Sequence, residues 1–182
     1  MKKKTTLSLF SGCGGMDLGF EGGFPVLKES VNKTIHPDWI DKGEAKEGFM
    51  RLKPTCFEIL FCNDNWPPAR AAWINEFLSR SQADPDIFNV ESIVDLVKTV
   101  HSGGVSALPK AVDVITGGFP CQDFSVAGKR KGFRSHKSHR GDFLTETDEP
   151  TIENRGKLYI WMREVVSLIK PKVFIAENVK GL

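Results

Sequence analysis

The sequence lacks the residue patterns of metal-stabilised and disulfide-stabilised proteins. It has four cysteines, Cys13, Cys56, Cys62 and Cys121, and no two of them form a Cys-x-x-Cys pair. No histidine cluster stands at the spacing that metal ligands need. We therefore assign no metal site, and we expect free thiols in a reducing compartment.

Long apolar runs and targeting signals are also missing. The longest apolar stretches are far too short to span a bilayer. The basic start, residues 1–4, is followed by a segment without a signal-peptide core or cleavage site. We therefore expect a cytoplasmic protein, or a nuclear one in a eukaryote. The net charge of +2 is too small to indicate nucleic-acid binding by itself.

The composition that is present suits one globular α/β domain. The 182 residues, 40% hydrophobic and 26% charged, suffice for one domain with a real core. Apolar patterning predicts strands at 6–10, 58–62, 87–90, 112–116 and 172–176. It predicts helices at 16–21, 67–80, 91–101 and 158–169. This alternation predicts a doubly wound, mostly parallel sheet of order 3-2-1-4-5 with helices on both faces.

Two segments depart from this alternation within the single predicted domain, residues 1–182. Residues 29–57 are polar and irregular, so we expect a surface insertion there. Residues 125–153 show no apolar periodicity, and loops of that length are usually functional or disordered. We expect residues 125–153 to form a mobile active-site loop.

Chemically distinctive residues follow three of the predicted strands. A glycine loop, 12–15, follows the first strand, Pro120-Cys121-Gln122 follows the fourth, and Glu177-Asn178 follows the fifth. The carboxyl ends of parallel strands share one edge, where ligands bind at the switch point of the strand order. A thiol in a Gly/Pro turn at such an end is well placed to act as a nucleophile.

The glycine loop does not carry the dinucleotide pattern Gly-x-Gly-x-x-Gly. After Gly12 and Gly14, the third glycine position holds Asp17, which disfavours a nicotinamide-dependent oxidoreductase. Asp64, after the second strand, could accept hydrogen bonds from ribose hydroxyls. A glycine loop in isolation more often makes a tight turn, as a lone buried cysteine is more often inert and a lone glutamate after a strand more often solvated.

Four motifs in a fixed order favour a functional site over these non-functional interpretations. They are Phe-x-Gly-x-Gly-Gly at 10–15, Gly-Phe-Pro-Cys-Gln at 118–122, Arg-Gly-x-Leu at 155–158 and Glu-Asn-Val at 177–179. Together they resemble the cytosine-C5 DNA methyltransferase family. The resemblance implies a Rossmann-like fold that uses S-adenosylmethionine to methylate C5 of a flipped-out cytosine in duplex DNA, in restriction-modification. A tRNA cytosine-C5 methyltransferase and an inactive regulatory subunit remain alternatives.

The resemblance also implies residue roles. The implied catalytic residues surround the reacting base: Cys121, Glu177, Pro120, Gln122, Asn178 and Arg155. The implied cofactor residues lie along the strand ends: Phe10, Ser11, Gly12, Cys13, Gly14, Gly15, Asp64, Asn65, Asn89, Pro120 and Leu158. Cys121 would add to C6 through a covalent bond while Glu177 protonates or hydrogen-bonds N3. Asn65 and Asn89 depart from the family, which often has an apolar or aromatic residue and an aspartate there.

A cationic stretch follows the predicted nucleophile. The implied DNA-binding residues are Ser125, Lys129, Arg130, Lys131 and Arg134, whose charged members would meet phosphates. Phosphate contacts carry no sequence information, so this segment should position the duplex rather than read it.

The motifs cover only the first part of the family pattern. The sequence ends at Leu182, before the further strands, the arginine motif and the target-recognition region of family members. We therefore expect a domain that is incomplete at its C-terminal side, with an exposed sheet edge. A second polypeptide would carry the missing parts, or the chain is a truncated form. By itself the chain should bind cofactor weakly and be inactive or nearly so.

Overall fold

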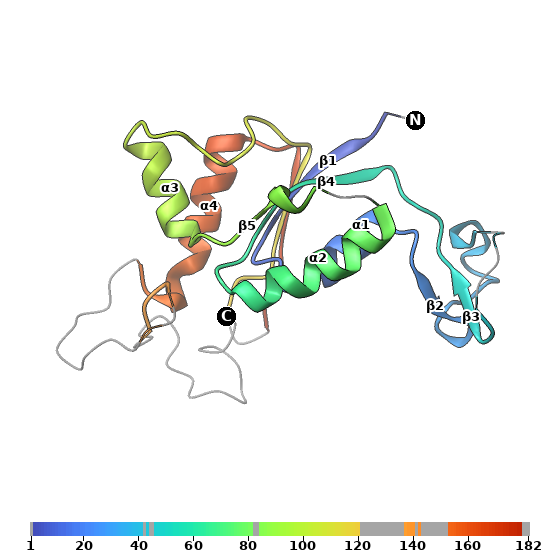
Figure 1. The fold of residues 1–182 in the computed structure, drawn as a ribbon. Coiled ribbons are helices and arrows are strands. Elements are labelled where there is room, and N and C mark those ends of the chain that lie inside the picture. Colours follow the sequence, from blue (N-terminus) through green and yellow to red (C-terminus); the bar gives the residue numbers. More distant parts are fainter. Residues whose placement is uncertain are drawn as a thin grey trace.

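The computed structural model describes residues 2–41, 43, 46–81, 84–120, 137–140, 142 and 153–179, and all structural statements below concern these residues. Figure 1 shows an α/β fold built on one central sheet, with a small hairpin beside it. The strands are β1 (Lys4–Leu9), β2 (Pro25–Leu27), β3 (Phe49–Arg51), β4 (Phe57–Asn63), β5 (Phe88–Asn89), β6 (Val114–Gly117) and β7 (Val173–Ala176). The α-helices are α1 (Gly15–Glu21), α2 (Pro67–Ser81), α3 (Ile93–His101) and α4 (Leu158–Ile169). Short 3-10 helices are η1 (Lys28–Ser30), η2 (Pro37–Trp39), η3 (Pro85–Ile87) and η5 (Arg155–Lys157).

The central sheet has five strands in the order β5-β4-β1-β6-β7, and every pair of neighbours is parallel. In chain order this is 3-2-1-4-5, so the predicted doubly wound topology is confirmed. The chain starts in the middle of the sheet, builds one half, then returns to build the other. The strand order therefore reverses between β1 and β6, which is where a doubly wound sheet forms its ligand crevice.

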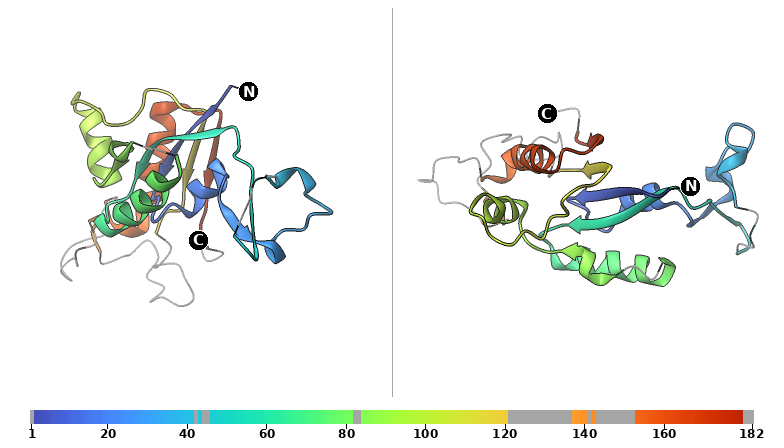
Figure 2. Two further views of the ribbon diagram at one scale, coloured as in Figure 1. Left: turned by 45° about the vertical axis from the view of Figure 1, so that its right-hand side comes forward. Right: turned by 90° about the horizontal axis from the view of Figure 1, so that it is seen from above.

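Helices cover both faces of the sheet, as predicted. Figures 1 and 2 show α3 and α4 on one side of the sheet and α1 and α2 on the other. On the first side Val97, Ile115 and Val165 are fully buried in one apolar cluster. On the second side Trp73 and Phe77 of α2 are fully buried in another. Removal of these side chains from water is the main force that holds the layers together.

The ends of the helices follow the local sequence. Prolines 67 and 68 occupy the first turn of α2, where the missing N–H has no intrahelical partner to lose. Ser92 caps α3, since its side chain accepts a hydrogen bond from the Val94 N–H. Lys170 ends α4 in a left-handed conformation.

Part of segment 29–57 differs from the irregular structure expected from its sequence. Residues 49–51 form β3, which pairs antiparallel with β2 and places Val26 opposite Met50. Met50 is 6% exposed, so one apolar side chain of the small hairpin is buried. Strands of three residues are too short to show a period of two, which is why the sequence pattern did not reveal them.

The strand β7 is an edge strand of the described sheet. The exposed fractions of Val173, Phe174 and Ile175 are 53%, 59% and 42%. A run of exposed apolar residues on a sheet edge is a feature of surfaces that other polypeptide covers. Among the helices described, none combines the length and apolarity that a membrane crossing requires.

Candidate functional site

One row of paired residues crosses the sheet at the carboxyl ends of its strands. Ala176, Gly117, Leu9, Asn63 and Asn89 are neighbours in that row. With strands about 4.8 Å apart, the row is about 19 Å long. The candidate residues come next along each strand, so segments 10–15, 64–65, 118–120 and 177–178 share one rim. The meeting of the loops after the first, fourth and fifth strands at one edge, predicted from topology, is confirmed for the described parts of these loops, which include Pro120 but not Cys121 and Gln122.

The glycine loop is held against the end of β4. The Ser11 N–H donates to the Asn63 carbonyl at 2.9 Å, and the Gly12 N–H donates to Asp64 Oδ2 at 3.0 Å. Gly12 and Gly14 have φ values of 54° and 88°, in the left-handed region that favours glycine. The loop therefore connects the two strand ends that are predicted to hold a cofactor.

The outer side of the loop has room for a ligand. A Cβ added at Gly12 or Gly15 would meet no described atom within 4 Å, and the Cys13 side chain is exposed. Asp64 Oδ1 accepts from the Trp66 N–H at 2.9 Å, so each carboxylate oxygen has one backbone donor and one remaining lone pair. An open glycine loop beside a carboxylate with free acceptor capacity fits the methionine and ribose parts of S-adenosylmethionine.

Two predicted adenine contacts lie at the neighbouring strand ends. Asn65 Nδ2 donates to the His139 carbonyl at 2.9 Å. Asn89 Oδ1 accepts from the Glu91 N–H at 2.8 Å, so this oxygen already has a backbone partner. A pocket of about 490 Å³ lies beside them, lined by Asn65, Val90, Glu91, Ser92, Asp95 and Arg140.

Two exposed apolar residues at this place were missed by sequence reasoning. The exposed fraction of Trp66 is 63% and that of Val90 is 41%. Trp66 follows Asp64 and Asn65, and Val90 follows Asn89 at the end of β5. The sequence did contain a signal for both residues: each is an apolar residue that follows a polar candidate residue just beyond the end of a strand.

The ends of β6 and β7 are tied together at the other half of the rim. The Glu177 N–H donates to the Gly117 carbonyl at 2.9 Å, and Asn178 Nδ2 donates to the Phe119 carbonyl at 3.0 Å. A Cβ added at Gly118 would lie 3.2 Å from Glu177 Oε2, so the exposed Glu177 carboxylate reaches the turn before Pro120. Phe119, 7% exposed, anchors that turn in the core.

The predicted nucleophile and DNA-binding residues fall outside the described residues. They are Cys121, Gln122, Ser125, Lys129, Arg130, Lys131 and Arg134, and most of the predicted loop 125–153 lies outside as well. The structure describes the chain up to Pro120. The turn just before Pro120 lies beside the Glu177 carboxylate.

Arg155 and Leu158 are the first residues of η5 and α4, the two elements that precede β7. The Arg155 N–H donates to the Lys137 carbonyl at 3.0 Å, while Leu158 is 4% exposed and packs in the core. His139 Nδ1 lies 2.7 Å from Ser92 Oγ at the start of α3. Burial lowers the pKa of His139, which favours the neutral imidazole in this contact.

Comparison with known proteins identifies the family. The family model described as C-5 cytosine-specific DNA methylase matches residues 4–182. The chain belongs to this family. Its match runs through every element of the central sheet, from β1 to β7. The mostly parallel α/β sheet agrees with this membership.

The individual relatives that match are much longer than this chain. The type II methyltransferase M.BsuRI of Bacillus subtilis is 31% identical over 183 residues, which covers 99% of this chain and 33% of the relative. The type II methyltransferase M.AquIA of Picosynechococcus sp. is 30% identical over 182 residues, covering 99% of this chain and 50% of the relative. The DNA (cytosine-5-)-methyltransferase M.ApeKI of Aeropyrum pernix is 30% identical, covering all of this chain and 30% of the relative.

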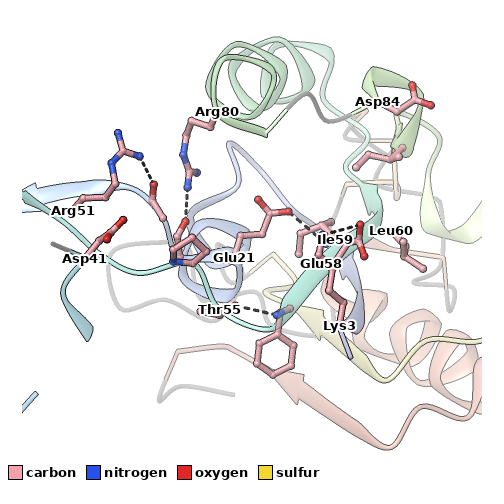
Figure 3. Close-up of a pocket in the computed structure, with 15 residues that line it drawn as sticks. Lys3, Glu21, Asp41, Arg51, Thr55, Glu58, Ile59, Leu60, Arg80 and Asp84 are labelled. Atoms are coloured by element: carbon pink, nitrogen blue, oxygen red, sulfur yellow. Dashed lines mark hydrogen bonds and ion pairs between the residues drawn. The ribbon is translucent and has the colours of Figure 1, made fainter. Parts of the chain in front are cut away.

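A second pocket of this family member lies far from the rim. It measures about 610 Å³ and opens at the amino end of β4, where Figure 3 shows side chains from α1, α2, β3 and β4. Arg80 donates to the Gly22 carbonyl, and Arg51 donates to the Gly23 carbonyl at 2.7 Å. These bonds join α2 and the hairpin to the end of α1. None of the site residues predicted from the sequence lines this pocket, and no group of metal-ligating side chains stands among the described residues.

Proposed function

We propose that this chain forms the catalytic and cofactor-binding part of an enzyme that methylates C5 of cytosine in duplex DNA. The observation that carries the proposal is the contact between the end of β7 and the turn after β6. It brings the Glu177 carboxylate to the turn that leads into Cys121. The family membership and the relatives named as type II methyltransferases support a place in restriction-modification. We expect the reaction to occur in the cytoplasm.

The proposed chemistry uses a thiol and a carboxyl group on one pyrimidine. Carbon 5 of cytosine is too weak a nucleophile to take a methyl group unaided. The Cys121 thiolate forms a bond to C6, which makes C5 enamine-like, and the Glu177 carboxyl group protonates or hydrogen-bonds N3 to stabilise the developing charge. S-adenosylmethionine, when bound, supplies the electrophilic methyl group. The C5 proton then leaves to solvent, and the bond between sulfur and C6 breaks to restore the ring.

The remaining residues position these groups. Asn178 holds the Phe119 carbonyl, and thereby the peptide bond to Pro120. Gln122 and Arg155 would contact the base or its neighbours. The cofactor would lie along the open side of the glycine loop, with Asp64 on its ribose and Asn65 and Trp66 on its adenine. Duplex DNA hides the reacting carbons in the stack, so the target base must be flipped out.

We propose that a second polypeptide completes the enzyme. The chain spans a third to a half of the length of the relatives M.BsuRI and M.AquIA. The exposed apolar residues of β7 offer a surface for such a partner. Phe174→Ser should weaken association with a co-purifying polypeptide at least tenfold and leave this chain's own unfolding within about 0.5 kcal/mol. Val105→Ser, at a residue 97% exposed away from β7, is the control.

The decisive experiment traps the covalent step. Duplex DNA containing 5-fluorocytosine is incubated with S-adenosylmethionine and the chain, with and without its co-purifying polypeptide. We expect an adduct between protein and DNA that survives denaturation. It should be absent in Cys121→Ser and present in Cys56→Ser. An adduct that persists in Cys121→Ser would remove Cys121 from its role, and methylation of tRNA but not of duplex DNA would favour a tRNA enzyme.

A further inference from the structure

The inner side of the glycine loop rests directly on α2. A Cβ added at Gly14 would lie 2.6 Å from Trp73 Cδ1 and 2.6 Å from Phe77 Cε2, closer than atoms can approach. The two rings are stacked, with centroids 4.1 Å apart and planes at 6°, and both are fully buried. The height of the loop above the sheet is therefore set by the position of these two rings.

A buried carboxylate fixes one of the rings. Asp17, 1% exposed in the first turn of α1, accepts a hydrogen bond from Trp73 Nε1 at 2.8 Å. The Cys62 thiol of β4 donates to the same carboxylate oxygen at 3.6 Å. Because α1 begins immediately after the loop, Asp17 connects the loop to both α2 and β4.

The pKa shifts of Cys62 and Asp17 bear on the hydrogen bonds that join the loop to α2 and β4. Burial raises the pKa of Cys62 well above its ordinary value, so the thiol keeps its proton and remains a donor. Burial also raises the pKa of Asp17, and the hydrogen bonds from Ser8, Trp73 and Cys62 oppose that rise. A buried carboxylate is costly unless such donors compensate it, so the arrangement is sensitive to the loss of any one of them.

The loop thus has one packed side and one open side. Gly14 is pressed against Trp73, whereas Gly12 and Gly15 face space free of described atoms within 4 Å. A shift of Trp73 would move the loop backbone into or away from that space. A small displacement of a binding loop weakens every contact that depends on its position.

We propose that Asp17 and Trp73 are positioning residues, which set the glycine loop at the height that the cofactor requires without touching the cofactor. The inference rests on the proposed function, because the loop must hold S-adenosylmethionine for its height to affect binding. Residues that affect cofactor binding would then include this buried pair between α1 and α2, as well as the residues that line the cofactor site.

The test compares loop position and cofactor affinity in matched variants. Trp73→Phe keeps the ring stack and removes the N–H donor, and Asp17→Leu removes the acceptor. Asp17→Asn keeps an acceptor oxygen and should restore much of the loss. Trp161→Phe, in the core on the other face of the sheet, is the control for a buried indole. Each variant is assayed well below its unfolding temperature.

Two readouts separate positioning from general stability. Isothermal titration should show S-adenosylmethionine affinity weakened about three- to tenfold in Trp73→Phe and Asp17→Leu, and unchanged in Trp161→Phe. The rate of Cys13 alkylation by iodoacetamide, followed by mass spectrometry, reports the loop without any cofactor, since Cys13 is exposed on it. This rate should change at least threefold in the same two variants.

The outcomes are distinguishable. Alkylation rates that differ less than threefold from the unmodified chain in both variants would overturn the positioning role, as would equal effects in Trp161→Phe. An unmodified chain that binds no S-adenosylmethionine would contradict the proposed function, and the Cys13 rates would still decide whether Asp17 and Trp73 position the loop.

Discussion

Asn178 Nδ2 donates a hydrogen bond to the backbone oxygen of Phe119 at 3.0 Å. The bond joins residues 59 positions apart and ties the end of β7 to the turn after β6. The Asn178 side chain also accepts from the Val179 N–H at 2.8 Å, which fixes the orientation of its amide. The segment that carries the proposed acid, Glu177, is thus fixed relative to the turn that ends at Pro120, just before the proposed nucleophile in the sequence.

Loss of this bond should slow the covalent step. Asn178→Ala leaves the Phe119 carbonyl without its side-chain partner, which should reduce the rate of adduct formation with 5-fluorocytosine DNA about tenfold. Asn32→Ala removes an amide that accepts turn N–H groups in a remote segment and should leave the rate unchanged. Equal rates for Asn178→Ala and the unmodified enzyme would show that the bond does not position the site.

A methyl group at Gly118 should disturb the acid directly. In Gly118→Ala the new Cβ would lie 3.2 Å from Glu177 Oε2, so the carboxylate must move by a few tenths of an ångström. We expect adduct formation to slow about tenfold, because catalysis depends on the placement of the acid. Gly19→Ala has open space and should raise helix stability by about 0.5–1 kcal/mol without slowing the reaction. A Gly118→Ala enzyme of normal rate would argue against a role for Glu177 near this turn.

The contact of Gly14 with the aromatic pair predicts a large stability difference between adjacent glycines. Gly14→Ala combines a φ of 88° with overlap of Trp73 and Phe77, and should lower the free energy of unfolding by about 2–4 kcal/mol. Gly15→Ala meets no described atom within 4 Å and should change it by less than about 1 kcal/mol. Urea unfolding of both variants measures the difference, and similar midpoints would refute the packing argument.

Asp113 should make the stability depend on pH in the acid range. A hydrogen bond from Lys172 Nζ at 2.6 Å, with the Thr5 N–H as second donor, lowers the pKa of Asp113 from 3.8 to about 2. The unfolded chain then binds the proton more readily, so this contribution is fully present above about pH 4 and is lost as pH falls towards 2. Asp113→Asn should remove this part of the pH dependence, as judged from urea midpoints between pH 2 and 6. Glu58→Gln, at an exposed ion pair with Lys3, is the control.

Much of the fold could be predicted because its signals are local. The apolar spacing from Leu158 to Ile169 predicts α4 and its buried face, and both residues are buried. The strand order followed from the alternation of strands and helices, since parallel strands need crossovers of one hand. The hairpin of β2 and β3 was not predicted, because strand pairing and the burial of Met50 define it, and strands of three residues are too short to show a pattern in the sequence.

For the candidate site, the sequence alone determined the chemical groups and their order along the chain: a glycine loop, a thiol turn, an arginine segment and a carboxyl–amide pair. Only the tertiary structure decided that Asp17 meets Trp73, that Asp64 meets Gly12 and that Asn178 meets Phe119. Motifs are contiguous in sequence and can be read directly. Contacts between residues more than fifty positions apart depend on how helices and sheet pack, and packing is a property of the whole chain.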